Sequence, residues 1–192
     1  MNKVAALSLA FLAANLITAS ANAAPETYII DNSHTFPRFE YSHLGFSTQV
    51  HRFNTTSGKI VLDRAAKSGS VDVVIDAKSV DTGSTVFNGH IQGEGFFDTA
   101  NFPTITYKST NLKFEGDNLV AVDGIMTMKG VSKPLTLTVT ALNCKPHPMN
   151  KKDACGGNAT GKLKRSDFNA GKYAPAVGDD VTLTLSIEAV KE

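Results

Sequence analysis

Hydrophobic and polar residues alternate strictly in two long stretches of the chain. In "KPLTLTVTAL" (133–142) and "DVTLTLSIEAV" (180–190), every second residue is hydrophobic and most of the residues between are threonine or another polar type. A β-strand with one buried and one wet face requires this pattern, because successive side chains point to opposite faces. Threonine suits the outer face, where it meets water and tolerates β geometry. Both stretches are therefore predicted to be strands that cover a hydrophobic interior.

Weaker alternation recurs along most of the remaining chain, with glycine-containing turns between the segments. The further predicted strands are 27–32, 39–43, 47–53, 58–63, 70–80, 104–110, 118–130 and 158–168. Eight or more antiparallel strands without a long helical pattern indicate an all-β sandwich or barrel. Internal repeats, linkers and low-complexity runs are missing from the sequence, so we expect residues 24–192 to form a single domain.

One connection, "DTGSTVFNGHIQGEGFFDTANFP" (81–103), breaks the alternation. It is rich in glycine and phenylalanine, and we predict one or two short helices joined to a loop. More than twenty residues between strands often mark a lid or a binding loop. The phenylalanines could equally pin the loop to the barrel, and the sequence leaves both interpretations open.

The N-terminal segment has the layout of a secretory signal peptide. Lys3 precedes an uncharged apolar run that ends in Ala21-Asn22-Ala23, a small-x-small cleavage pattern. The alternative, a membrane anchor, needs about 20 continuous apolar residues, and polar residues interrupt the second half of this run. We expect cleavage after Ala23 and a periplasmic or secreted protein.

The charge balance excludes several classes of partner. The chain has 19 Lys and Arg against 18 Asp and Glu, and Lys3 is the one charge that signal cleavage removes. A mature chain without net charge lacks the electrostatic footprint of a nucleic-acid-binding protein, and nothing predicts recruitment to an anionic membrane surface. The later apolar runs are too short to span a bilayer, so an integral membrane protein is not expected.

Cys144 and Cys155 are the two cysteines, in "NCKPHPMNKKDACGG". An even, closely spaced pair in an exported protein predicts a disulfide, here closing a loop that has little to bury. A metal site with His147 would offer only three soft ligands at a spacing that fits no zinc pattern. We predict a structural disulfide at the rim of the fold, and no metal.

Three histidines fall in and just after "HTFPRFEYSHLGF". On one strand, His34 and His43 have opposite parity and cannot point at a common ion, so a metal site from this segment is not expected. One histidine is expected to be buried and hydrogen-bonded, with the others at the surface or in turns. Parity places His43 on the same face as Phe39 and Tyr41, which predicts that His43 points into the interior.

The sequence contains no nucleophile elbow, zinc-protease helix or phosphate-binding glycine loop. An enzyme that acts on a lipid, with His43 beside Tyr41 or Glu40, remains an alternative without an assembled catalytic set. We expect no enzymatic activity and no cofactor.

Several segments together resemble the YceI-like proteins. They are "HTFPRFEYSHLG", "SVDTGS", "HIQGEGFFDTANFPTITYKST", "GIMTMKGVSKPLTLTV" and "KLKRSDF", which follow the family order across 27–190. The resemblance implies an eight-stranded, antiparallel, lipocalin-like barrel that holds a long isoprenoid chain in an exported bacterial protein. It leaves open a structural or stress-response protein whose barrel is filled by its own side chains, and a homodimer is possible.

The resemblance and strand parity together select candidate ligand-binding residues. The predicted wall residues are Phe39, Tyr41, Ile105, Tyr107, Met126, Met128, Leu135, Leu137, Leu183, Leu185 and Ile187. Phe87, Phe96 and Phe97 are candidates for the mouth, and His43, His90 and Arg165 for a polar head group such as a quinone or a diphosphate. Each wall residue could instead be plain core.

The chain departs from the family pattern at two places. Gln92 stands where the family often has an arginine after the His-Leu pair, which favours a neutral head group, such as a quinone, over a diphosphate. The loop between Cys144 and Cys155 is additional, and we expect it to have a structural role.

Overall fold

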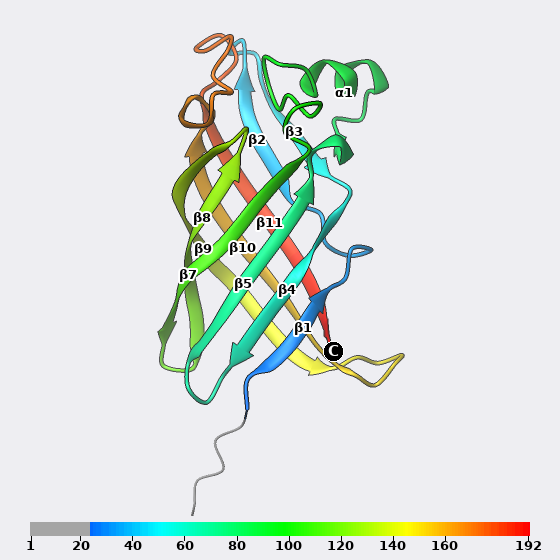
Figure 1. The fold of residues 1–192 in the computed structure, drawn as a ribbon, viewed down its shortest axis with the longest axis vertical. Coiled ribbons are helices and arrows are strands. Elements are labelled where there is room, and N and C mark those ends of the chain that lie inside the picture. Colours follow the sequence, from blue (N-terminus) through cyan, green and yellow to red (C-terminus); the bar gives the residue numbers. More distant parts are fainter. Residues whose placement is uncertain (1–23) are drawn as a thin grey trace, which may run out of the picture.

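The computed structural model describes residues 24–192, so the predicted signal peptide and its cleavage site lie outside the described residues. The described chain winds into a closed barrel with one short helix at one end (Figure 1). The strands are β1 (Glu26–Ile30), β2 (Arg38–His43), β3 (Ser47–Phe53), β4 (Thr56–Asp63), β5 (Ser68–Asp76), β6 (Val80–Asp81), β7 (Thr104–Glu115), β8 (Asn118–Met128), β9 (Val131–Pro146), β10 (Asp153–Lys164) and β11 (Asp180–Lys191). The helices are α1 (Thr85–Ile91) and the 3-10 turns η1 (Ala77–Ser79) and η2 (Arg165–Phe168). Within residues 24–192, none of these helices is long and apolar enough to cross a membrane.

The eleven strand segments form the eight strands of the barrel. Three of these eight strands are interrupted: β1 continues as β2, β3 as β4, and β5 as β6. Every pairing in the sheet is antiparallel. The order β1-β4-β5-β7-β8-β9-β10-β11 returns to β1 through the β1–β11 pair, so the sheet has no free edge there. The eight-stranded, antiparallel, lipocalin-like barrel predicted from the sequence is confirmed.

The break between β1 and β2 is held by side chains in place of ladder bonds. β11 pairs with β1 at one end and with β2 further along, and Thr35 lies between the two. Its fully buried hydroxyl donates to the Glu188 carbonyl at 3.2 Å and accepts from the Glu188 amide at 3.1 Å. The Asn32 side-chain oxygen likewise accepts from the Thr56 amide at 2.6 Å. These bonds satisfy backbone groups that would otherwise be buried without partners.

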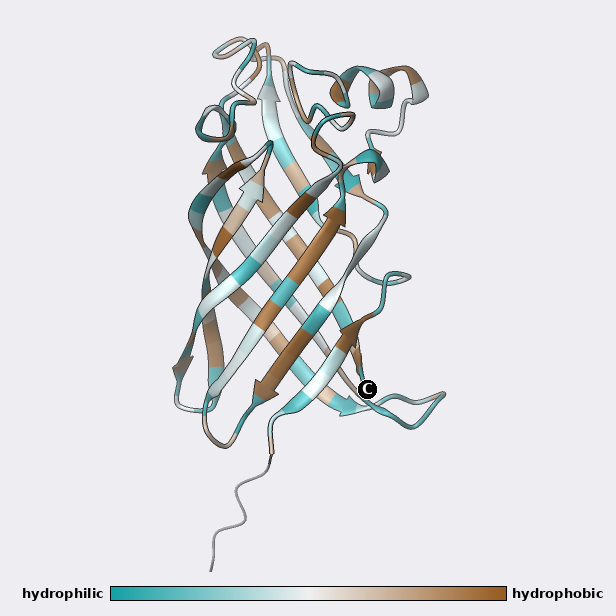
Figure 2. Ribbon diagram, viewed as in Figure 1, coloured by the Kyte–Doolittle hydropathy of each residue, from teal (hydrophilic) through white to brown (hydrophobic). Residues whose placement is uncertain are grey.

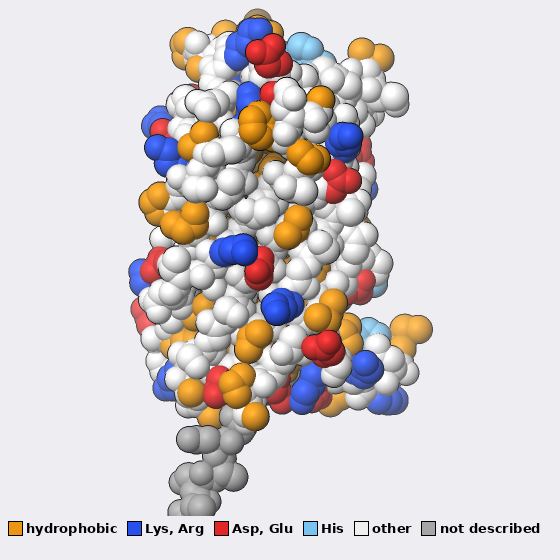
Figure 3. Space-filling view, viewed as in Figure 1, with side chains coloured by type: hydrophobic (Ala, Val, Ile, Leu, Met, Phe, Trp, Pro, Cys, Tyr) orange, Lys and Arg blue, Asp and Glu red, His pale blue; other side chains and the backbone are white. Residues whose placement is uncertain are grey.

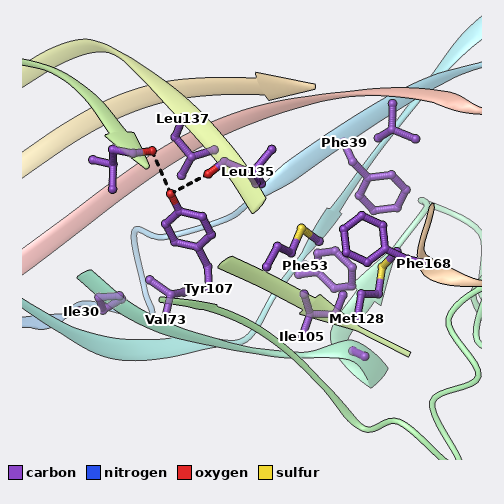
Figure 4. Close-up of a cluster of buried hydrophobic side chains, with 14 of the residues drawn as sticks. Ile30, Phe39, Phe53, Val73, Ile105, Tyr107, Met128, Leu135, Leu137 and Phe168 are labelled. Atoms are coloured by element: carbon purple, nitrogen blue, oxygen red, sulfur yellow. Dashed lines mark hydrogen bonds between the residues drawn. The ribbon is translucent and has the colours of Figure 1, made fainter. Parts of the chain in front are cut away.

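Alternation along each strand separates a hydrophobic interior from a polar surface (Figure 2). Tyr107 shows how closely the interior is packed (Figure 4). Its hydroxyl donates to the carbonyls of Val122 at 2.9 Å and Leu135 at 3.2 Å. Burial raises the pKa of this phenol far above its ordinary value. Gly124 makes room for the ring, because a Cβ there would lie 2.4 Å from Tyr107 Cζ.

The structure corrects several predicted boundaries. The strand predicted over 70–80 is divided into β5 and β6 by η1, and the one predicted over 104–110 extends to Glu115 in β7. The strand predicted over 158–168 is β10, Asp153–Lys164, and the chain turns into η2 at Arg165. The cysteine loop is also shorter than predicted, because the β9–β10 ladder continues through Cys144 and Cys155, which face each other in register. Their disulfide is confirmed, and it links two paired strands. The 81–103 connection contains one α-helix, α1, capped by the Ser84 hydroxyl.

Candidate ligand-binding tunnel

Three hydrophobic cavities follow one another inside the barrel. The cavity next to α1 has about 70 Å³ of open space, the middle one about 90 Å³ and the last about 100 Å³. The first two share Phe39, Ile105 and Met126 among their lining residues. The last two share Val71 and Leu137 with other residues. The cavities are therefore segments of one narrow tunnel.

The structure brings the predicted wall residues together along this tunnel. All eleven line the first or second cavity, from strands β2, β7, β8, β9 and β11: Phe39, Tyr41, Ile105, Tyr107, Met126, Met128, Leu135, Leu137, Leu183, Leu185 and Ile187. Figure 4 shows several of them, with Phe53 and Phe168 near Phe39 and Met128. Period-two parity was sufficient to place these side chains, because a barrel strand has one inner face.

A buried histidine and a tyrosine form the polar pair nearest the first cavity. His51 is 4% exposed, and its Nε2 lies 3.1 Å from the hydroxyl of Tyr41, a cavity-lining residue. The rings of Phe39 and Phe87 each lie 5.6 Å from the His51 ring. Among residues 24–192, Nδ1 of His51 has no hydrogen-bond partner. A buried ring nitrogen without a partner costs free energy, so the pair has capacity for one further polar contact.

Burial determines the protonation of this pair. Loss of hydration lowers the pKa of His51 below its ordinary value of 6.5, although the charge of Asp81 opposes the shift. Burial likewise raises the pKa of the Tyr41 phenol. Both side chains are therefore neutral near pH 7. In one tautomer Nε2 of His51 donates to Tyr41, and the hydroxyl hydrogen of Tyr41 is then free to donate to another group.

The structure places His43 at the rim of the barrel, and the buried histidine is His51. β2 ends at His43, where the chain meets the rim and bridges to Val177. The side chain is only partly buried and does not line the tunnel cavities. The inward histidine is His51, directly opposite Phe39 in the β2–β3 register. The alternation of Val50, His51, Arg52 and Phe53 contained this signal, since Phe53 shares the parity of His51.

Of the three predicted mouth residues, Phe96 and Phe97 line the first cavity, whereas Phe87 is half-buried against His51. His90, a predicted head-group residue, is exposed and does not line the cavity. The ring of His90 lies 5.2 Å from Phe96, on the outer side of the helical segment. His90 is thus displaced from the tunnel because α1 directs Ile91, its buried neighbour, inward.

Arg165 lines the first cavity, but its guanidinium donates its hydrogen bonds to backbone carbonyls. Nε donates to the Gly178 carbonyl at 2.8 Å, Nη2 donates to Val177 at 2.6 Å, and Nη1 donates to Lys172 at 2.8 Å and to Ala170. The side chain is 6% exposed. These bonds hold the loop of residues 165–178 over the barrel, so the prediction that Arg165 meets a ligand head group is not supported by its geometry.

The 85–102 segment and the 165–178 loop together cover the tunnel beside Tyr41. Lys129 joins them, because its Nζ donates to the Glu94 carbonyl at 2.7 Å and to the Asn169 carbonyl at 2.8 Å. The rings of Phe96 and Tyr173 pack 5.5 Å apart across the same boundary. Lys129 was not predicted, since a lysine just after a strand is ordinarily solvent-exposed.

One group of metal-ligating side chains lies outside the tunnel. Asp31, His34 and Glu188 place one possible ligand atom each within 4.8 Å of one another. His34 is exposed, and its Nδ1 lies 2.8 Å from an Asp31 carboxylate oxygen. The hydrogen bond with Asp31 raises the pKa of His34. Neither His43 nor His51 belongs to this group.

Comparison with known proteins identifies the family. The model of the YceI-like domain matches residues 28–189. This chain belongs to the YceI-like family. It is 34% identical to Protein YceI of Salmonella arizonae over 187 residues, which cover 96% of this chain and 97% of the relative. Protein YceI of Salmonella enteritidis PT4 matches to the same extent.

Solved structures share the fold. The Campylobacter jejuni YceI protein has a TM-score of 0.68 and 26% identity, with 79% of this chain and 90% of that chain covered. Burkholderia cenocepacia BcnA has a TM-score of 0.71 and 22% identity, with 83% and 99% covered. A polyisoprenoid-binding domain from Saccharophagus degradans, implicated in plant cell wall breakdown, has a TM-score of 0.64 and 22% identity, with 86% and 98% covered.

Proposed function

We propose that this protein binds one long apolar molecule, a polyisoprenoid or a similar amphiphile such as a quinone, lengthwise in the barrel for transport, storage or sequestration. The observation that carries the proposal is the continuous hydrophobic tunnel from Tyr41 to Leu142. Membership of the YceI-like family supports an apolar ligand, and one protein of the same fold is a polyisoprenoid-binding domain.

The physics of the tunnel suits a slender hydrocarbon. Each CH₂ group transferred from water to an apolar site gains about 0.8 kcal/mol, so a long chain needs few polar contacts for tight binding. Met126 and Met128 in the wall are adaptable, because thioether side chains fit irregular shapes. The cavities are too narrow to hold a compact, bulky ligand without displacing these side chains.

A polar head group is best placed at the Tyr41–His51 pair. Tyr41 lines the first cavity, and the pair has an unused hydrogen-bonding capacity at His51 Nδ1 or at the Tyr41 hydroxyl. Both groups are neutral near pH 7, and the donors of Arg165 already bind backbone carbonyls. The site therefore favours an uncharged carbonyl or hydroxyl over a diphosphate.

An exported location is part of this proposal. The predicted signal peptide supports it, and so does the Cys144–Cys155 disulfide, since disulfides persist in oxidising compartments. The alternative of a lipid-acting enzyme loses its proposed pair, because Tyr41 contacts His51 and no hydrogen bond joins it to His43 among the described residues. The competing alternative is a barrel filled by its own side chains. The open space in the three cavities is about 70, 90 and 100 Å³, so a long ligand must displace side chains such as Met126 and Met128 to enter.

The test is to purify the protein from its native host, extract it with organic solvent and identify the extract by mass spectrometry. We expect about one long-chain lipid per protein, and rebinding of a ubiquinone-type ligand by the delipidated protein. Repeated extracts without stoichiometric lipid, together with no uptake of added ligand, would reject the proposal. A variant whose tunnel is blocked at Leu183 serves as the matched control.

A further inference from the structure

Large hydrophobic side chains are exposed around the end of the barrel that carries α1. Four of them are exposed by 51% (Leu44), 89% (Phe46), 86% (Val86) and 47% (Tyr173), and we call these four residues the apolar rim. Figure 3 shows hydrophobic side chains along this end of the molecule. Single exposed hydrophobic residues are ordinary, but a group at the end of a hydrophobic tunnel indicates an interaction surface.

The segments that bear the apolar rim are in direct contact with one another. The Leu44 amide donates to the Ala176 carbonyl at 2.8 Å, which joins the β2–β3 turn to the 165–178 loop. Tyr173 packs on Phe96 of the 85–102 segment, and that segment also contacts β3 through Phe87 and His51. These same segments contribute Phe96 and Val177 to the lining of the first cavity, so the apolar rim lies on the segments next to that cavity.

The four residues of the apolar rim lie in short stretches that carry little charge, and Glu94, Asp98 and Asp167 lie in the adjoining parts of the same segments. Residues 43–47, 84–90 and 171–178 contain one lysine, Lys172, and no acidic residue. Residues 145–153, at the opposite end, contain three lysines and one aspartate. An apolar surface with little charge is suited to insertion at the boundary between lipid head groups and acyl chains.

Two members of the apolar rim adopt an unfavourable backbone conformation. Leu44 has φ 53° and Tyr173 has φ 73°, in the left-handed region that bulky residues rarely occupy. Both side chains remain about half exposed, so burial within the protein does not offset the cost of this backbone conformation. Backbone strain of this kind is concentrated at functional sites, and here it presents apolar side chains outward.

We propose that the apolar rim docks on the surface of a lipid bilayer, so that the ligand passes between the membrane and the tunnel without crossing water. The inference rests on the proposed function and specifies how its ligand arrives. A bilayer fits because the four exposed side chains lie on the segments that cover this end of the tunnel and need no matching charges. Docking through this rim places the first cavity, beneath the 85–102 segment, next to the acyl chains.

The sequence contains no tryptophan, which permits a direct test. Phe46→Trp places a single fluorophore on the apolar rim, and Met149→Trp places one at 86% exposure at the opposite end as the matched control. Each variant is mixed with phosphatidylcholine vesicles and with vesicles that also contain phosphatidylglycerol. We expect a blue shift of emission and quenching by bilayer-embedded quenchers for Phe46→Trp alone, with neutral vesicles sufficient.

A shift of both fluorophores, of neither, or only with anionic vesicles would overturn the proposal. A blue shift that depends on protein concentration without vesicles, together with a dimer in sedimentation, would assign the apolar rim to a second copy of this chain and also overturn it.

Ligand transfer separates this inference from the proposed function. In a variant with Phe46→Ser and Val86→Ser, uptake of a ubiquinone-type ligand from vesicles should slow at least tenfold. Uptake of the same ligand dispersed in detergent should match the unchanged protein. Equal uptake from vesicles by both proteins contradicts docking through the rim. Failure of the unchanged protein to bind the dispersed ligand contradicts the proposed function, whatever the vesicle result.

Discussion

The two ends of the barrel are built differently. At the α1 end, the 85–102 segment and the 165–178 loop cover the tunnel, and Leu44 and Tyr173 have left-handed backbone conformations. At the other end the strands are joined by short turns, the Cys144–Cys155 disulfide links β9 to β10, and Lys191 pairs with Glu26 at 2.8 Å. Figure 3 shows Lys, Arg, Asp and Glu side chains gathered there.

We expect the end with the disulfide to stabilise the barrel and the α1 end to open for exchange of the proposed ligand. Short turns and covalent links restrict opening, whereas segments held by a few side-chain bonds open at lower free energy. The proposed function requires one end of the tunnel to open for a long molecule and the rest of the barrel to stay closed.

Arg165 should be the most sensitive residue of the α1 end. Arg165→Leu leaves the carbonyls of Ala170, Lys172, Val177 and Gly178 without their buried donor. We expect the free energy of unfolding in urea to fall by about 4 kcal/mol. Arg64→Leu at the other end, where the arginine is 59% exposed and makes one 3.7 Å ion pair, is the control and should change it by less than about 0.5 kcal/mol. Similar losses in both variants would contradict the structural role given to Arg165.

Blocking the tunnel should abolish binding while the fold survives. Leu183 lines both the first and the second cavity, so Leu183→Trp should fill the space through which the ligand runs. We expect the dissociation constant for an isoprenoid ligand to rise at least about 100-fold, equivalent to about 2.7 kcal/mol. Thr184→Trp, on the outer face of the same strand, should bind as the unchanged protein does. Unaltered binding by Leu183→Trp, measured by ligand fluorescence or extraction, would place the ligand elsewhere.

Removing the disulfide should affect stability and leave binding unchanged. Cys144→Ser with Cys155→Ser opens a crosslink of 11 residues separation at the end away from Tyr41. The expected loss of unfolding free energy is about 2.5 kcal/mol. Ligand affinity should be the same as for the unchanged protein in oxidising buffer. A large loss of affinity would show that the two ends are not independent.

His51 should confer a modest pH dependence on stability. Its pKa is lower in the folded protein than its ordinary value of 6.5, so the unfolded chain binds the extra proton more readily. Stability from this residue is complete above about pH 6.5 and is lost as the pH falls below it. We expect His51→Gln to cost about 1 kcal/mol at pH 7 and to flatten the decline between pH 6.5 and 5 in urea melts. An unchanged slope would contradict the neutral, buried state of His51.

Much of this architecture could be predicted from the sequence. Alternation placed the wall residues on the inner face, because in a barrel the strand direction and one parity decide the orientation of every side chain. Alternation was not sufficient at the end of a strand. β2 ends at His43, so parity no longer determines where that side chain lies. From the sequence, the charge of Arg165 suggested a contact with a ligand head group. In the structure its guanidinium donates instead to backbone carbonyls of Val177 and Gly178.

The buried polar contacts could not be predicted because each joins distant segments. Thr35 bonds to Glu188 across 153 residues of chain, and Lys129 reaches Glu94 and Asn169. No local pattern marks such partners. His51 is different, since its parity with Phe53 pointed inward and the signal was present in the sequence.

The measurement that tests the central claim most directly is a crystal structure of the protein purified from its native host without removal of bound lipid. We predict continuous density for one elongated molecule along the barrel axis, past Met126 and Leu137, with its polar end beside Tyr41 and His51. A barrel interior that holds only water or rearranged side chains, in crystals of protein offered a ubiquinone-type ligand as well, would contradict it.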